Sequence, residues 1–577
     1  MSTALKEKKK KENNENAIDK RVVDTFNYNV ISKILLVFIT LGPIFDIISF
    51  LFRNKFDSKI SISTFIRPII PLFVGIYIFF TASKKNKKRL AITAIIYLSY
   101  AICHLLVVRN LFTGCSDGTI VTEFQYICNF TFLIIDLIIY TYTFYFEGYI
   151  LEKAGSKLNE NENIHINEDI FQNENIESNN IETLKEKNST EPNLFETNTE
   201  ILNVNSKKYK RLIMKNIIAS LSNAIVIMVA IYLFSIFISI ITNTSSPTYI
   251  ETNTGYKGWI ESGNSLSAIL VVSLFVILTS INFSKWREKN KKEKFIEIFK
   301  LITAISDFIY LATLLGTRTG LFGAFLSLIC YIIVEMICSK NKKVFYAGLV
   351  FIIAGITAVS LFGSKTLKRR AEMKKSQFTI IDKSTGKIGN MTGDMLDFKN
   401  SILDGTMEDG FMSQAQKDAT LDLYSYAQKH NIAGNNTRKQ QLIYNIYLVK
   451  HQKSLLCVLF GNGFKTNYRE MTMENELASL LLNFGVCGFI LYALPFLYVL
   501  ILAIENIVIE ARKKESNLKN SIMYMLSLGL VITLSWFSGY VFFATSNMIV
   551  ISMVVVLNLL EFQNGNWLNK KFKLFEK

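Results

Sequence analysis

The sequence lacks the residue patterns of several large classes of protein. Only seven of its 577 residues are cysteine and four are histidine. The cysteines show no metal-ligand spacing, and five of them lie inside or at the ends of apolar segments: Cys103, Cys128, Cys330, Cys338 and Cys487. Neither a disulfide framework nor a zinc site is supported. There is also no P-loop and no dinucleotide fingerprint, because GNG at 461–463 is too short for GxGxxG.

Acidic residues are fewer than basic ones, which leaves a formal net charge of +17. In a soluble protein this excess would suggest nucleic acid as a partner. Here the lysines gather in short stretches between apolar segments, such as KKNKKR (84–89), KWREKNKKEK (285–294) and KNKK (340–343). This is the pattern of the positive-inside rule. The basicity therefore reflects membrane topology, and we expect no nucleic-acid partner.

Long apolar runs dominate the chain, since half of its residues are hydrophobic. A run of roughly twenty apolar residues is long enough to cross a bilayer core. Such runs lie at 31–52, 66–83, 90–108, 120–147, 214–242, 263–283, 297–316, 319–338, 344–362, 475–506, 519–537 and 544–561. We therefore predict an all-α polytopic membrane protein with about twelve transmembrane helices, one large external helical loop, and both termini in the cytoplasm.

The order of these runs also predicts the domains. Residues 151–210 are rich in Asn and Glu, and residues 363–473 have helical apolar periodicity. The first of these segments has too few apolar side chains to offset the entropy of ordering. The predicted parts are a cytoplasmic basic tail (1–30), helices one to four (31–150), a disordered cytoplasmic insertion (151–210), helices five to nine (211–362), an external catalytic loop (363–473), helices ten to twelve (474–562) and a cytoplasmic tail (563–577). The polar start is unlike a cleavable signal peptide, so we expect the first helix to be an uncleaved anchor.

An arginine, Arg318, stands between two predicted helices in the stretch TRTG at 317–320. The predicted topology places it at a tight external hairpin. A charge at membrane depth is costly unless it faces a cavity or a partner, which makes it a candidate functional residue. The alternative is a snorkelling side chain that anchors a helix end.

A second signal follows the long loop. RKQQLIYNIYLVKHQKSLLCVLFGNGFKTN (438–467) starts with Arg438, and MENELASLLLNFGVCGFILYALPF (473–496) re-enters the membrane. This order resembles the O-antigen ligase and Wzy-type polymerase family, which has S/T-R-x-G or S/T-R-x-A between two helices, then a large external loop with R-x-x-x-W/Y and G-x-G, and a re-entry H-N-x-x-L-x-x-L-x-x-x-G-x-x-G. The matching positions are Thr317, Arg318 and Gly320, then Arg438, Gly461 and Gly463, then Asn475, Leu481, Gly485 and Gly488. Glu474 stands at the position of the family histidine, and Asn264 matches the asparagine of an earlier P-N motif whose proline is missing here.

This resemblance implies a membrane glycosyltransferase that needs no cofactor and no metal. Its donor and acceptor would be polyprenyl (undecaprenyl) diphosphate-linked glycans in contact with membrane lipids, and its further partners a flippase and a chain-length regulator. Departure of a sugar leaves negative charge on the diphosphate, which guanidinium groups stabilise. We assign this role to Arg318 and Arg438, with Arg469 as a third substrate-binding arginine.

Attack by an acceptor hydroxyl also requires a base. Glu474 is the candidate, and Glu476 is an alternative, although either carboxylate could instead pair with Arg438 or Arg469. The resemblance adds Asn264, Asn475, Gly461 and Gly463 as substrate-binding positions. Asp46, Asp136 and Asp307 could form a proton path or make interhelical hydrogen bonds, and His104 is interpreted as a packed or interfacial histidine.

The predicted function is polymerisation of lipid-linked oligosaccharide units into a capsular or O-antigen-like surface polysaccharide, outside a bacterial cytoplasmic membrane. A ligase that transfers finished glycan to an envelope acceptor is the alternative within the class. A lipid-linked oligosaccharide flippase or other transporter, and a noncatalytic assembly protein, are the alternatives outside it.

Overall fold

The structure is a computed structural model that describes most of the chain. The described residues are 30–56, 62–82, 84–111, 118–144, 194–249, 253–282, 286–287, 289–339, 348, 352–353, 355–357, 359, 363–377, 394–407, 412–430, 432, 437–464, 473–513, 518–537, 539 and 541–564. The chain forms two compact units, Met1–Val37 with Tyr140–Leu221 and Phe38–Ile139 with Ser222–Lys577. The second unit contains all the candidate site residues.

Helices of apolar composition make up most of the described chain. They are α2 (Val30–Phe56), α3 (Ile62–Thr81), α4 (Lys84–Leu111), α5 (Gly118–Phe144), α7 (Leu194–Ile241), α8 (Gly263–Ser280), α9 (Lys291–Ile309), α10 (Arg318–Ser339), α19 (Leu494–Lys513), α20 (Leu518–Phe537) and α21 (Thr545–Asn564). Within the described residues, nine helices are long and apolar enough to cross a membrane. The prediction of an all-α polytopic membrane protein is confirmed.

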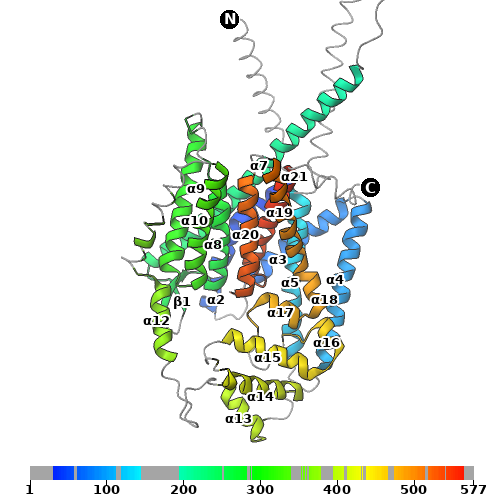
Figure 1. Cartoon of the computed structure of the whole chain (residues 1–577), viewed down its shortest axis with the longest axis vertical. Coiled ribbons are helices and arrows are strands. Elements are labelled where there is room, and N and C mark those ends of the chain that lie inside the picture. Colours follow the sequence, from blue (N-terminus) through cyan, green and yellow to red (C-terminus); the bar gives the residue numbers. More distant parts are fainter. Residues whose placement is uncertain are drawn as a thin grey trace, which may run out of the picture. The chain divides into compact units, whose positions relative to one another are not determined.

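The helices α8 and α21 form the centre of the second unit. More than four-fifths of the apolar stretch of each is buried, 83% for α8 and 89% for α21. Helix α8 packs against α10, α20 and α21, as Figure 1 shows for α8, α10 and α20. Helices on the outside, such as α4, expose large apolar side chains, including Ile95 and Leu98. Such exposed apolar faces suit contact with lipid.

The predicted span 475–506 is wrong as a single helix. The chain there forms three helices, α17 (Glu476–Leu482), α18 (Gly485–Tyr492) and α19. The break between α17 and α18 lies at Gly485, whose φ is +73°. A side chain there would be strained, and a Cβ would lie 2.5 Å from the Gly461 nitrogen. Apolar composition alone does not reveal such a break. The predicted span 344–362 lies mostly outside the described residues.

The predicted insertion 151–210 is only partly described. Residues 151–193 lie outside the described residues, and α7 begins at Leu194. The end of this segment therefore joins a long helix, where KKYKRLIMK (207–215) supplies good helix formers.

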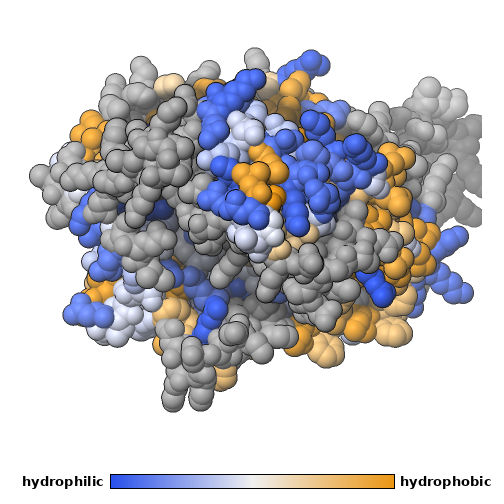
Figure 2. All heavy atoms as spheres, turned by 90° about the horizontal axis from the view of Figure 1, so that it is seen from below, coloured by the Kyte–Doolittle hydropathy of each residue, from blue (hydrophilic) through white to orange (hydrophobic). Residues whose placement is uncertain are grey.

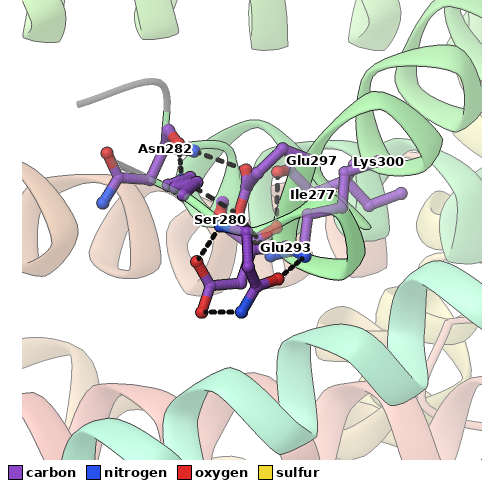
Figure 3. A network of polar contacts seen from close by, with 8 residues as sticks. Ile277, Ser280, Asn282, Glu293, Glu297 and Lys300 are labelled. Carbon is purple, nitrogen blue, oxygen red and sulfur yellow. Dashed lines mark hydrogen bonds and ion pairs between the residues drawn. The ribbon is translucent and has the colours of Figure 1, made fainter. Parts of the chain in front are cut away.

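The connection from α8 to α9 is held by a network of charged and amide groups (Figure 3). The Asn282 backbone N–H donates to Glu297 Oε2 at 2.8 Å, and Lys300 Nζ donates to the Ser280 carbonyl at 3.2 Å. Asn290 and Glu293 form a capping box at the start of α9. The lysine-rich stretch in this connection therefore begins a well-capped helix.

The connection from α7 to α8 contains a hairpin that the sequence analysis does not predict. Strands β1 (Ser246–Tyr249) and β2 (Thr254–Gly258) pair antiparallel, with Pro247 opposite Tyr256. The Tyr310 hydroxyl donates to the Tyr256 carbonyl at 2.6 Å. Tyr310 begins a π-helical segment, η1 (Tyr310–Leu314), that follows α9. The hairpin is thus tied to the end of α9.

The long loop after 363 contains α12 (Lys365–Gln377), α13 (Asp394–Leu403), α14 (Gln414–Lys429), α15 (Thr437–Gln452) and α16 (Leu455–Phe460). Helices α14 and α15 pack on each other. The segment from α13 to α15, called the cap below, has its own buried cluster: Met412, Ala419, Leu423, Ala427, Ile432, Tyr444 and Leu448. Seen from below the view of Figure 1, hydrophilic residues surround a small hydrophobic group near the centre, and more hydrophobic residues lie toward the right-hand side (Figure 2). The cap is thus a folded helical body rather than an extended loop.

Candidate functional site

The loop arginine and the re-entry glutamate are in direct contact. Arg438 Nε donates to Glu474 Oε2 at 2.9 Å, and both side chains are partly exposed, at 38% and 30%. Arg438 lies in the first turn of α15, and Glu474 lies directly before α17. The second carboxylate oxygen of Glu474, Oε1, accepts no hydrogen bond from the described residues. It is therefore available to accept a proton.

Three chain segments fix this pair. The Glu474 backbone N–H donates to Gln441 Oε1, one turn along α15, at 3.1 Å. The Arg438 guanidinium also donates to the Phe537 carbonyl at the end of α20. Gly539 has φ +68°, and a Cβ there would lie 2.5 Å from the Glu474 carbonyl oxygen. Helix α15, the start of α17 and the turn after α20 thus meet at Arg438 and Glu474.

Glu476 lies two residues further on and has a different environment. Its side chain is 4% exposed. Its carboxylate accepts three backbone N–H bonds, from Val541 and Phe543 to Oε1 and from Phe542 to Oε2, at 2.8 to 2.9 Å. These contacts occupy both oxygens and hold the turn between α20 and α21. Glu476 therefore shapes the turn, whereas Glu474 is the carboxylate that faces outward.

The two glycines of the loop motif dock against the break between α17 and α18. The Asn462 N–H donates to the Leu482 carbonyl at 3.1 Å, and the Gly463 N–H donates to the Asn483 carbonyl at 2.9 Å. Gly461 has φ +91°, and a Cβ there would overlap the Asn483 carbonyl oxygen. The structure therefore gives Gly461 and Gly463 a backbone-packing role, which the spacing GNG alone did not reveal.

A buried dyad from the first helices supports the same loop. His104 and Glu123 are both 0% exposed, with His104 Nε2 at 2.7 Å from Glu123 Oε1. His104 Nδ1 contacts the Phe460 carbonyl, so this nitrogen carries the donated hydrogen. Glu123 Oε2 accepts the Phe464 N–H at 2.7 Å. The dyad thus contacts the loop on both sides of Gly461 and Gly463, at Phe460 and at Phe464.

This dyad was missed by the sequence reasoning, which treated His104 as a packed histidine. Tyr100, one turn earlier on α4, donates to the Phe484 carbonyl at 2.7 Å. The spacing of Tyr100 and His104 is therefore the one local signal that marks this face of α4 as a polar contact surface.

Arg318 lies in another neighbourhood. It is the first residue of α10 and is exposed, with no ion pair to any described residue. Thr317 begins the helix, because its Oγ1 accepts the Gly320 N–H at 3.0 Å. Thr366, in α12, donates to the Thr317 carbonyl at 3.2 Å. Arg318 therefore lies at the start of α10, beside the basic helix α12. Among the described residues, no contact joins Arg318 to Arg438.

The remaining predicted site residues are less informative. Asn264 lies in the first turn of α8, and Asn475 precedes α17 without a side-chain cap bond. Arg469 lies outside the described residues. The structure thus brings together Arg438, Glu474, Asn475 and Glu476, and it separates them from the surroundings of Arg318.

The acids within the membrane segments differ in their partners. Asp46 accepts hydrogen bonds from Arg67 at 2.7 Å and from Tyr232 at 2.5 Å. Both oxygens of Asp307 are buried without a hydrogen-bond partner among the described residues. The interhelical hydrogen bonds proposed from the sequence are therefore present at Asp46.

The fold and these contacts define a polytopic helical membrane protein with a helical cap, in which Arg438 of the cap contacts Glu474 at the start of the following helices. A family model described as O-antigen ligase like membrane protein matches residues 201–563. This match covers more than half of the chain, and the chain belongs to that family. Membership supports a membrane glycan-transfer function that acts on lipid-linked glycans. No curated protein matched the chain.

Proposed function

We propose that this protein is a membrane glycosyltransferase that polymerises polyprenyl diphosphate-linked oligosaccharide repeat units into a surface polysaccharide, outside the cytoplasmic membrane. The contact between Arg438 and Glu474 carries the proposal. The two residues are far apart in sequence, and each was selected by a separate motif of the family. A pair that is partly exposed and held by three segments is suited to act on a substrate at the membrane surface.

In this mechanism Glu474 is the general base. Its Oε1, which the described residues leave without a hydrogen bond, takes the proton of an acceptor hydroxyl as that hydroxyl oxygen attacks the anomeric carbon of the donor sugar. The bond from this carbon to the diphosphate oxygen breaks, and the electron pair leaves with the lipid diphosphate. Arg438 orients the carboxylate and is close enough to the reaction to offset the charge on the departing phosphate.

Arg318 has the chemistry of a second phosphate contact. Its guanidinium is exposed at a helix start, where backbone N–H groups also favour an anion. Because Arg318 and Arg438 have different neighbours, we assign them to different parts of the lipid-linked substrate. Arg469 remains a proposed third contact, and Asn264, Asn475, Gly461 and Gly463 remain proposed substrate-binding positions.

The test is turnover by purified protein in lipid nanodiscs, with a lipid diphosphate glycan extracted from the cells that produce it. Glu474→Gln removes the base, and we expect transfer to fall about 10²- to 10⁴-fold. Arg438→Ala is expected to reduce transfer about 10²- to 10³-fold. Lys439→Ala changes the exposed residue beside Arg438 and serves as the control. Undiminished transfer by Glu474→Gln and Arg438→Ala would remove the mechanism.

Ligation of finished glycan to an envelope acceptor is a second candidate, favoured by the description of the matched family. Deletion of the protein distinguishes the two functions. A polymerase leaves single repeat units on lipid, whereas a ligase leaves full-length unattached polymer, and the length of the lipid-linked glycan can be read on a gel.

A further inference from the structure

A cavity of about 190 Å³ with both polar and apolar walls lies within the second unit, and neither Arg438 nor Glu474 lines it. This is much more space than the ~10–15 Å³ that one water molecule needs. Asp46, Arg67 and Tyr232 line one part of it. Ser262 and Ser265 at the start of α8, and Thr545 and Ser546 at the start of α21, line another.

The cavity is next to the elements that carry the family motifs. Phe543 and Ala544 line it, and the Phe543 N–H is one of the three groups held by Glu476. The Ser265 hydroxyl bonds Ser546 at 2.9 Å and Asn547 at 3.0 Å, which joins the starts of α8 and α21. The turn that Glu476 holds therefore forms part of the cavity wall.

The buried arginine in this cavity retains hydrogen-bonding capacity. Arg67 is 4% exposed and donates from Nη2 to the Gly42 carbonyl at 2.9 Å and to Asp46 at 2.7 Å. Its Nε is buried and has no hydrogen-bond partner in the described part of the chain. A buried donor of this kind is costly.

Each charged side chain that lines the cavity is paired with an opposite charge. Arg67 pairs with Asp46, and Glu261 pairs with Arg53 at 3.5 Å. Lys257 donates to the Glu261 carbonyl at 2.7 Å, and burial lowers the pKa of its ammonium group while Glu261 raises it. A ligand with net charge would therefore find each charged lining side chain already paired. An uncharged ligand with many hydroxyl groups matches this mixture of donors and acceptors.

The remaining lining suits the same kind of ligand. Gln125 and Asn129, one turn apart on α5, add amide groups that both donate and accept. Phe543 adds an apolar surface, and its ring stacks on Tyr126 with centroids 4.5 Å apart. A fixed aromatic ring beside convergent polar groups is typical of a small-molecule site.

Four of the fifteen lining residues come from outside the matched family region. The match begins at residue 201, whereas Asp46, Arg67, Gln125 and Asn129 lie in α2, α3 and α5. The transfer motifs lie inside the matched region. Part of the cavity wall therefore comes from helices that the family match does not cover.

We infer that the cavity binds one uncharged sugar residue of the lipid-linked glycan and that Asp46, Arg67, Gln125 and Asn129 select that sugar. This inference rests on the proposed function and assigns substrate selection to the first helices. The residues named are positioning and specificity residues, since none of them is placed at the reacting atoms.

The first experiment measures binding of the fluorescently labelled glycan, released from its lipid, to the protein in nanodiscs. Ala544→Leu reduces the cavity, and Gln125→Ala with Asn129→Ala removes two amides. Loss of neutral hydrogen bonds is expected to weaken binding about threefold to tenfold. Phe124→Ala, an exposed neighbour on α5, is the control. Inorganic phosphate is the second probe. If phosphate displaced the glycan from the wild-type protein but not from Ala544→Leu, the cavity would be an anion site and the inference would be overturned.

The second experiment measures kcat/KM for the natural lipid-linked glycan and for one in which a single sugar is changed. Arg67→Lys keeps the charge but loses the planar donor set, so we expect the preference for the natural glycan to decrease while the thermal unfolding temperature is kept. The inference would be overturned if Arg67→Lys left the glycan preference unchanged and the other cavity variants left glycan binding unchanged. In that case the proposed function would still stand, provided that Arg438→Ala abolished transfer. Absence of transfer by wild type would count against the proposed function itself.

Discussion

Glu474 and Glu476 have the same side chain but different partners. Glu476 is buried under three backbone N–H groups, whereas one oxygen of Glu474 accepts from Arg438 and the other has no hydrogen bond to the residues that the structure describes. The sequence analysis named Glu474 as the base and Glu476 as an alternative. Spacing could not separate them, because the donors to Glu476 come from residues 541–543, far along the chain.

Gly461 provides a prediction at the same scale. Gly461→Ala places a Cβ against the Asn483 carbonyl oxygen at a positive φ, so we expect a destabilisation of about 1–3 kcal/mol or more. The measurement is thermal unfolding of the purified protein. Gly405→Ala is the matched control, since Gly405 also has a positive φ but has nothing within 4 Å of a Cβ. Equal effects of the two substitutions would show that packing of the glycine loop is unimportant.

At the scale of elements, the cap is stabilised by its own apolar cluster, in which Leu423 is fully buried. Apolar periodicity in 363–473 predicted helices, and α14 and α15 lie within that segment. Their side-by-side packing depends on which apolar faces meet, which the periodicity of each helix does not specify.

Leu423→Ala tests the independence of the cap. Truncation of a buried leucine costs about 2–5 kcal/mol, so we expect faster amide hydrogen exchange throughout α14 and α15. Exchange in α8 should be unchanged, because α8 lies outside this cluster. Leu403→Ala, at an exposed leucine, is the control. Faster exchange in α8 to the same extent would show that the cap and the helical bundle unfold as one unit.

At the scale of the whole molecule, the apolar runs predict which segments cross the membrane, and lysine clusters predict the orientation. We expect Ser425→Cys, at an exposed position in the cap, to react with a membrane-impermeant maleimide added outside intact cells. Lys292→Cys, at an exposed position near the start of α9, should react only after permeabilisation. Both variants are made in a background without native cysteines. The reverse pattern of labelling would place the cap in the cytoplasm and remove the proposed external reaction.

The sequence by itself determined that this is a helical membrane protein, where most of its long apolar helices lie, and which family its motifs match. These properties depend on local composition and on short spacings, which hydropathy and motif patterns report directly. Only the tertiary structure decided that one predicted span is three helices and that Glu476 holds a turn. It also decided that His104 and Glu123 bind the loop on both sides of its glycines, and that α3 and α5 contribute to a cavity. Each of these depends on hydrogen bonds between residues distant in sequence, whose partners are chosen by the packing of whole helices.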